Sequence, residues 1–186
     1  ISCLTEPYWF LGKDRYLEEI VETVSIPVLR KDFTCDEYMI YQAKAMGASA
    51  VLLICSVLDD QELQAFSQLS AQLGLSALVE THSEKEIERA KKAGALILGV
   101  NNRNLKDFSV DLSNSTRLRE LAGPDTIFVS ESGIRDAKDI QVLQKNGTDA
   151  VLIGEMLRRA PGSNQTLRGL RQAARQLRAG RLAAGE

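Results

Sequence analysis

The sequence predicts an α/β protein of the TIM-barrel type, (β/α)8, that lacks the first strand/helix unit. Short apolar runs alternate with segments of helical periodicity, and strict alternation gives parallel strands joined by right-handed crossovers. Polar side chains follow many of the apolar runs. This favours a closed barrel, in which every strand ends at one shared site, over an open sheet, which concentrates its ligand contacts at one switch point. The sequence also lacks the G-x-G-x-x-G motif that is typical of an open sheet that binds dinucleotides.

Seven apolar runs are the predicted strands. Most are continuously apolar, as expected for strands covered on both faces. In chain order they span residues 1–5, 27–33, 50–54, 77–81, 96–100, 126–130 and 150–153. A complete barrel has eight strands in ~250 residues, whereas this chain has 186 and begins with Ile1. We therefore expect one strand and its helix to be missing before Ile1.

Helices are predicted between the strands, over residues 14–24, 36–46, 59–73, 83–93 and 136–146. Four begin at residues that cap helix N-termini, namely Asp36, Asp59, Ser83 and Asp136. Four are followed by a glycine that stops the helix, namely Gly47, Gly74, Gly94 and Gly147. Residues 156–159 are expected to form a short helix.

The end of the chain is predicted to be an amphipathic helix over residues 165–179. Its apolar residues Leu167, Leu170, Ala174 and Leu177 fall at helical spacing. Five arginines between 168 and 181 are interpreted as a solvated face rather than as a site for an anionic partner. The whole of 1–186 is expected to form a single, incomplete barrel domain.

Composition excludes several classes of protein. The formal net charge of −2 gives no basic surplus for non-specific binding of nucleic acid. No apolar run approaches the ~20 residues of a membrane helix, and no signal peptide opens the chain. The three cysteines lack metal-binding spacing and are expected to be buried or half-buried free thiols in a reducing, cytoplasmic location. A single histidine makes neither a metal site nor a catalytic triad, so we interpret His82 as a loop residue.

Two ionisable side chains end separate predicted strands. Lys31 lies between Arg30 and Asp32, and alternation along the strand points Lys31 away from both neighbours. A lysine directed into a barrel mouth would suit a general acid, although a surface lysine in a charged loop is the alternative. Glu80 could act as a base, or could support the start of the helix that Ser83 caps.

Polar and glycine-rich turns follow the later strands. In the run from Asn101 to Asn104, one side chain could fix a substrate carboxylate or hydroxyl, and Arg103 offers a bidentate fork; a polar loop is the alternative. Gly133 and Gly154 follow two adjacent strands, where many barrels bind phosphate through backbone amides. Glu155 is unexpected there, because a carboxylate repels phosphate unless it points away.

Motifs in this order resemble indole-3-glycerol phosphate synthase up to about residue 160. The specific blocks are Arg30-Lys31-Asp32-Phe33 and Asn101-Asn102-Arg103-Asn104-Leu105. Shorter matches are Leu4-Thr5-Glu6, Pro27-Val28-Leu29, Leu52-Leu53-Ile54, Leu78-Val79-Glu80, Gly99-Val100, Ser130-Glu131-Ser132-Gly133-Ile134 and Leu152-Ile153-Gly154-Glu155.

The resemblance implies a cofactor-free barrel of the ribulose-phosphate-binding type that serves tryptophan biosynthesis. This lyase converts 1-(2-carboxyphenylamino)-1-deoxyribulose 5-phosphate into indole-3-glycerol phosphate, carbon dioxide and water. It assigns Lys31 as the general acid of ring closure and Glu80 as the acid/base group of dehydration. The remaining assignments are substrate orientation by Asn101, Arg103 and Glu131, phosphate binding by Ser132, Gly133, Gly154 and Glu155, and contacts with the anthranilate ring by Phe10 and Phe33.

The family's first strand and loop supply a glutamate, a second active-site lysine and part of the substrate pocket, and this chain begins after them. We therefore expect it to have little activity and poor solubility alone. Two alternatives remain open: an inactive fragment of this enzyme, or a sister phosphate-binding barrel such as phosphoribosylanthranilate isomerase. The expected partner is a phosphorylated small molecule, with no metal, nucleic acid or membrane; a fused or associated enzyme of the tryptophan pathway is a further possibility.

Overall fold

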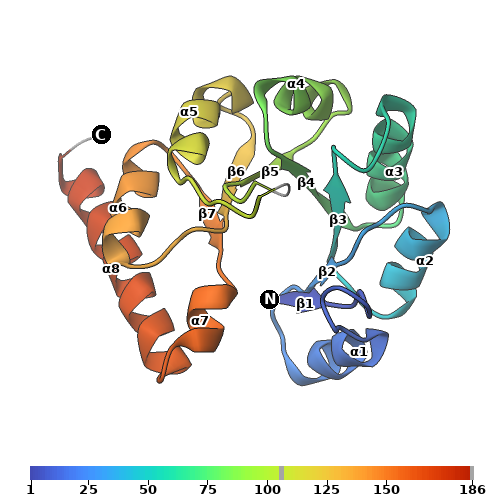
Figure 1. Ribbon diagram of the computed structural model, residues 1–186, viewed down its shortest axis with the longest axis horizontal. Helices are drawn as coiled ribbons and strands as arrows, with labels where there is room; N and C mark the ends of the chain where they lie inside the picture. The colour runs from blue at the N-terminus through green and yellow to red at the C-terminus, as the bar shows by residue number, and fades with distance from the viewer. Residues whose placement is uncertain (105–106, 185–186) are drawn as a thin grey trace. The chain divides into compact units, whose positions relative to one another are not determined.

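The computed structural model describes residues 1–104 and 107–184, and the side chains within this range up to residue 175. Seven strands alternate with helices in this part of the chain (Figure 1). The strands are β1 (Ser2–Leu4), β2 (Leu29–Lys31), β3 (Ala50–Ile54), β4 (Ser76–Thr81), β5 (Ile97–Asn101), β6 (Ile127–Glu131) and β7 (Ala150–Leu152). They are ordered in the sheet as in the sequence. This confirms the predicted β/α fold class, with one strand fewer than the eight of a complete barrel.

The helices also follow the prediction, with one exception. They are α1 (Asp14–Thr23), α2 (Glu37–Ala45), α3 (Asp60–Gln72), α4 (Glu84–Lys92), α5 (Ser113–Ala122), α6 (Ala137–Lys145), α7 (Glu155–Arg159) and α8 (Ser163–Ala184). Helix α5 was missed. No side chain caps its N-terminus at Leu112, and its buried side includes the polar Ser115, so neither the capping signal nor a fully apolar stripe marks it.

The predicted caps are confirmed at the level of individual hydrogen bonds. Asp59 accepts from the backbone N–H of Glu62, whose side chain accepts from Asp59 N–H, which completes a capping box. The side chains of Asp36, Ser83 and Asp136 likewise accept backbone N–H groups in the first turn of α2, α4 and α6. The four predicted stop glycines have φ between 70° and 84°, a left-handed conformation that glycine adopts without steric cost.

By its contacts the chain forms two compact units, Ile1–Gly99 with Pro124–Thr126, and Val100–Gly123 with Ile127–Glu186. Each of the two units contains its own set of the predicted site residues. In the first unit, strands β1 to β4 pair in parallel, with Ser2 opposite Leu29 and Ala50 opposite Ser76. Its fully buried core is apolar and includes Leu17, Ile40, Leu52, Leu53, Leu63 and Ile87.

In the second unit, β6 and β7 pair in parallel, with Val129 opposite Ala150. Ile134, Ile140, Leu143 and Leu170 form a buried cluster between α6 and α8. Leu170 and Ala174 therefore pack as predicted, but Leu167 is 41% exposed and does not belong to the packed face. The arginines at 168, 171 and 175 are exposed, as expected for a solvated face. The side chain of Leu177 and the whole of Leu105 lie outside the described residues.

The cysteine prediction was partly wrong. Cys3 and Cys55 are buried free thiols, whereas Cys35 is exposed. Cys35 directly precedes the N-cap of α2, and its Sγ lies 4.0 Å from Met39 Sδ. None of the described helices has a stretch both long and apolar enough to cross a membrane.

Candidate active site

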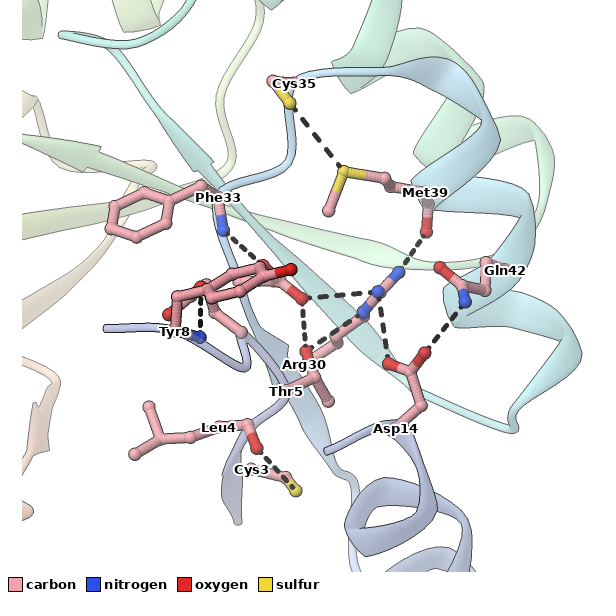
Figure 2. A network of polar contacts seen from close by, with 12 residues as sticks. Cys3, Leu4, Thr5, Tyr8, Asp14, Arg30, Phe33, Cys35, Met39 and Gln42 are labelled. Atoms are coloured by element: carbon pink, nitrogen blue, oxygen red, sulfur yellow. Dashed lines mark hydrogen bonds and ion pairs between the residues drawn. The ribbon is translucent and has the colours of Figure 1, made fainter. Parts of the chain in front are cut away.

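The charged side chains at the end of strand β2 lie on two opposite faces of the strand. Arg30 and Asp32 are buried on the same face, with Arg30 Nη2 3.3 Å from Asp32 Oδ2. Thr5 Oγ1 donates to Asp32 Oδ2 at 2.6 Å and accepts from Arg30 Nε at 3.2 Å (Figure 2). Because side chains alternate along a strand, Lys31 points to the opposite face, as predicted.

The Arg30 guanidinium also joins β2 to two helices. Its Nη1 donates to the carbonyl of Met39 in α2 at 2.7 Å, and its Nη2 donates to Asp14 at the start of α1 at 3.4 Å. Gln42 donates to the other oxygen of Asp14 at 2.9 Å (Figure 2). The carboxyl end of β2 is thus held from both sides by charge-assisted hydrogen bonds, which fixes the backbone that carries Lys31.

Lys31 and Glu80 come from different strands and meet in the first unit. Lys31 Nζ lies 3.8 Å from Glu80 Oε2, and their side chains are 19% and 3% exposed. An ammonium and a carboxylate at this separation form a proton donor and a proton acceptor that can serve one small substrate. The structure therefore brings together the two residues that the sequence places at strand ends 49 positions apart.

Two aromatic rings lie beside this pair. Phe10 and Phe33 stack with their centroids 5.1 Å apart and an interplanar angle of 26°. Lys31 Nζ lies 5.7 Å from the centroid of Phe10, within range of a cation–π interaction. The lysine is thus placed next to an aromatic surface that could receive a planar ring.

Glu6 shapes the loop that carries Phe10, a role that the sequence analysis missed. Its carboxylate accepts the backbone N–H groups of Tyr8, Trp9 and Phe10 at 2.8, 2.6 and 2.8 Å. Burial opposes ionisation, but the three N–H groups outweigh it and lower the pKa of Glu6. The available signal was an acidic residue that is followed, after Pro7, by three consecutive aromatic residues.

His82 lies in the turn between β4 and α4, as predicted for a loop residue, and it also contacts this group. Its Nε2 lies 3.5 Å from Glu80 Oε1, and its Nδ1 lies 3.5 Å from Glu86 Oε2. The sequence analysis could not find this contact, because it depends on how the turn after β4 folds back over Glu80.

In the second unit, Asn102 ties the end of β5 to the end of β6. Its Nδ2 lies within 3.1 Å of Ser130 Oγ and of the carbonyls of Glu131 and Ser132, and its Oδ1 accepts from Ser115 N–H and Oγ. Asn102 is 4% exposed. We assign it a structural role, which leaves its neighbours Asn101 and Arg103 as the candidates for substrate contact.

Asn101, Arg103 and Glu131 stand at strand ends of this unit. Asn101 Oδ1 accepts the N–H of Arg103 at 3.0 Å, and Glu131 is 2% exposed at the end of β6. Arg103 forms a 2.7 Å ion pair with Glu155 at the start of α7. The carboxylate that was unexpected beside a phosphate site is therefore turned towards a guanidinium.

The two predicted phosphate-site glycines differ in their surroundings. Gly133 has φ of +81°, and a Cβ there would collide with Val110 Cγ1. A Cβ on Gly154 would meet no atom within 4 Å. Ser132 has φ of +65°, an unfavourable conformation for a residue with a side chain, and such strain is common at ligand sites. Packing against Val110 explains why position 133 is a glycine, whereas packing gives no reason for a glycine at position 154.

The site residues thus fall into two groups, one in each unit. Lys31, Glu80, Phe10 and Phe33 lie in the first, and the second contains Asn101, Arg103, Glu131, Ser132, Gly133, Gly154 and Glu155. Among the described residues, no three His, Cys, Asp or Glu side chains gather closely enough to hold a metal ion.

Comparison with known proteins identifies the family. The family model for indole-3-glycerol phosphate synthase matches residues 1–170. The chain belongs to the indole-3-glycerol phosphate synthase family. A synthase of this family from Ruminiclostridium cellulolyticum is 56% identical over 174 residues, which are 94% of this chain and 67% of the relative. One from Endomicrobium trichonymphae is 55% identical over 92% of this chain and 66% of its own length. The chain thus spans about two thirds of these indole-3-glycerol phosphate synthases.

Solved structures show the same fold at low identity. A 3-hexulose-6-phosphate synthase from Salmonella typhimurium superposes with a TM-score of 0.79 at 16% identity, over 94% of this chain and 87% of that one. A 3-keto-L-gulonate-6-phosphate decarboxylase from Vibrio cholerae gives 0.75 at 12% identity, over 94% and 85%. These likenesses confirm the β/α fold of the chain.

Proposed function

We propose that this protein is an indole-3-glycerol phosphate synthase and that its first unit carries the acid–base chemistry. Its substrate would be 1-(2-carboxyphenylamino)-1-deoxyribulose 5-phosphate. The observation that carries the proposal is the Lys31–Glu80 pair beside the stacked Phe10 and Phe33 rings. These groups supply a proton donor, a proton acceptor and an aromatic surface, which are the elements needed to close a ring on an anthranilate.

In the first half of the proposed reaction, the ring carbon that bears the carboxylate attacks the ribulose carbonyl carbon. Lys31 donates a proton to the carbonyl oxygen, which becomes a hydroxyl as the new carbon–carbon bond forms. The cation–π distance of 5.7 Å keeps the ammonium near the aromatic surface where the anthranilate ring would lie. Ring closure interrupts the aromaticity of the anthranilate, and loss of carbon dioxide returns the electron pair of the broken bond to the ring system.

In the second half, water is eliminated and the indole is completed. The hydroxyl formed in the first half leaves with a proton, and a proton is removed from the adjacent carbon. Glu80, buried and 3.8 Å from Lys31, is placed to transfer protons in this step. Carbon dioxide and water are then the two by-products.

We assign the substrate phosphate to the second unit, at Ser132, Gly133, Gly154 and Glu155, with Asn101, Arg103 and Glu131 orienting the rest of the molecule. The open space at Gly154 and the left-handed backbone at Ser132 support this assignment. A phosphorylated small molecule is then the binding partner. We also propose a cytoplasmic location, supported by the three free thiols, and a fused or associated enzyme of the tryptophan pathway as a partner.

Replacing Lys31 tests the proposed chemistry. In the full-length polypeptide as its gene encodes it, Lys31→Met is expected to reduce formation of the indole product by roughly 10²–10⁴-fold, the usual contribution of a general acid or base. Product can be followed by indole absorption and by release of carbon dioxide. Phosphoribosylanthranilate serves as the control substrate, because its conversion would support the sister isomerase instead. A Lys31→Met variant that keeps more than about a tenth of the wild-type rate would refute the assignment.

We further propose that these 186 residues have little activity and poor solubility when expressed alone. The proposal is supported by the lengths of the relatives, because the stretch that matches this chain is about two thirds of each relative. A strand with unpaired backbone groups at a sheet edge also invites association with other chains. Expression of the chain alone, and with the additional segment of a relative supplied in trans, tests this. Activity should appear only in the second case, and a soluble, active monomer would contradict the proposal.

A further inference from the structure

His82 stands between two carboxylates in the first unit. Its two ring nitrogens each lie 3.5 Å from a carboxylate oxygen, Nε2 from Glu80 and Nδ1 from Glu86. The imidazole is 18% exposed, while the Glu80 side chain is 3% exposed. A carboxylate beside each ring nitrogen stabilises the positively charged imidazolium electrostatically.

The partner on the far side of the ring is itself held in place. Glu86 Oε2 accepts the backbone N–H of His82 at 2.6 Å, and the N–H of Glu86 donates to Ser83 Oγ, the N-cap of α4. The side-chain and backbone contacts of His82 therefore converge on one carboxylate oxygen. This orients the imidazole so that Nε2 is directed at Glu80.

Two further charged side chains lie near these three residues, and neither takes the place of His82 between the two carboxylates. Lys31 lies beyond Glu80, at 3.8 Å from its Oε2. Arg89 lies near Glu86, but its guanidinium is engaged by Asp60 and by the carbonyls of Cys55 and Leu58. The order across the site is thus ammonium, carboxylate, imidazolium, carboxylate.

We propose that His82 is a positioning residue for Glu80: its imidazolium, oriented by Glu86, lies 3.5 Å from Oε1 and holds that oxygen by charge attraction, while Oε2 faces Lys31. The proposal rests on the assignment of Glu80 as the acid/base group. It gives the Glu80 carboxylate a defined orientation, with Oε1 beside the imidazolium and Oε2 beside the ammonium of Lys31, from which it can transfer protons.

Electrostatics agrees with this geometry. Burial lowers the pKa of His82, but the hydrogen bond with Glu86 and the charges of Glu80 and Glu86 outweigh it, so the pKa is raised. Burial raises the pKa of Glu86, yet its interactions with His82 and Arg89 lower it overall. The imidazolium therefore persists to higher pH than in a free histidine.

The first test measures the ionisation of His82 directly and does not depend on catalysis. The ring protons are followed by NMR as the pH is varied, and their signals are assigned by their loss in His82→Gln. Glu86→Gln and Glu80→Gln should each lower the midpoint by about 1 unit or more, since each removes an anion beside the ring. Glu88→Gln, at an exposed position of the same helix, should leave it unchanged. An unmoved midpoint in Glu80→Gln would overturn the proposal even if the proposed reaction is correct.

The second test uses the pH dependence of turnover in the full-length polypeptide. In His82→Gln the imidazolium is gone and Lys31 is the one charge of the proposed arrangement that still contacts the carboxylate, so the acid limb of kcat/KM should move to higher pH by about 0.5–1 unit. KM should change less than kcat, because His82 does not contact substrate. His82→Arg, which restores a cation, should return the limb towards its original position. A uniform loss of rate at every pH would show a merely structural role and refute the proposal.

If neither the wild type nor its variants turn over this substrate, the proposed function fails while the NMR titration still decides whether His82 is coupled to Glu80.

Discussion

Glu155 links two arginines of the second unit. Its Oε2 lies 2.7 Å from Nη2 of Arg103, and its Oε1 lies 3.0 Å from Nη2 of Arg159. The carboxylate is 48% exposed. In the proposed phosphate site, the Glu155 carboxylate therefore competes with a bound phosphate for the two arginines.

Glu155→Gln is therefore expected to bind inorganic phosphate more tightly, by about threefold. Removing one negative charge ~4 Å from a ligand anion in water is worth ~1 kcal/mol at most, and solvent screening reduces it. Calorimetric titration at low and high salt measures the difference, which should shrink as salt rises. Glu120→Gln, at an exposed position on α5, is the matched control. Weaker phosphate binding by Glu155→Gln would show that Glu155 orients Arg103 for the ligand instead of competing with it.

Gly154→Val separates ligand binding from folding. A Cβ there meets no protein atom within 4 Å, and φ is −123°, outside the left-handed region that requires glycine, so thermal stability should be preserved. A phosphate bound against the backbone would collide with the new side chain. We expect phosphate affinity to fall about tenfold, or 1.4 kcal/mol, with a smaller loss in Gly154→Ala. Equal calorimetric affinities in wild type and Gly154→Val would remove Gly154 from the site.

The Arg30 network is expected to be the most sensitive polar element of the first unit. Arg30→Met leaves Asp32 buried without its cation and frees the carbonyl of Met39, which should lower the free energy of unfolding by about 3 kcal/mol or more. Urea denaturation measures the change. Arg15→Met is the control, because the Arg15–Glu19 pair is exposed and should cost less than ~1 kcal/mol. A loss in Arg30→Met no larger than in the control would mean that the network does not hold β2 in place.

The three thiols should differ in reactivity. Burial, followed by the charge of Glu86, raises the pKa of Cys55 to about 12, whereas Cys35 is exposed. In the native state a disulfide reagent at pH 8 should modify Cys35 first, because the thiolate is the reactive form and must be accessible. Mass spectrometry of the labelled protein identifies the site, and Cys35→Ser should abolish the fast phase. Rapid labelling of Cys55 would indicate that β3 opens readily.

Alternation of apolar runs with capped helices was sufficient to predict the β/α class and most element boundaries to within a few residues. These signals are local: a strand buried on both faces must be apolar, and a helix needs partners for its first N–H groups. Helix α5 was not predicted, because Leu112 has no side chain that can cap the helix. The strand-end positions of Lys31 and Glu80 were also local information, since a strand boundary shows in the sequence.

Which of these side chains contact one another is seen only in the folded structure. The contacts of Lys31 with Glu80, of His82 with Glu80, and of Arg103 with Glu155 join residues on different elements or across a turn. Their distances depend on how strands are ordered and how each loop folds back, which no periodicity encodes. The fold class and the candidate residues could be predicted from the sequence, because burial and capping act over a few residues. The partner of each charged side chain depends on packing between elements, because only packing brings charges from different elements within a few ångströms.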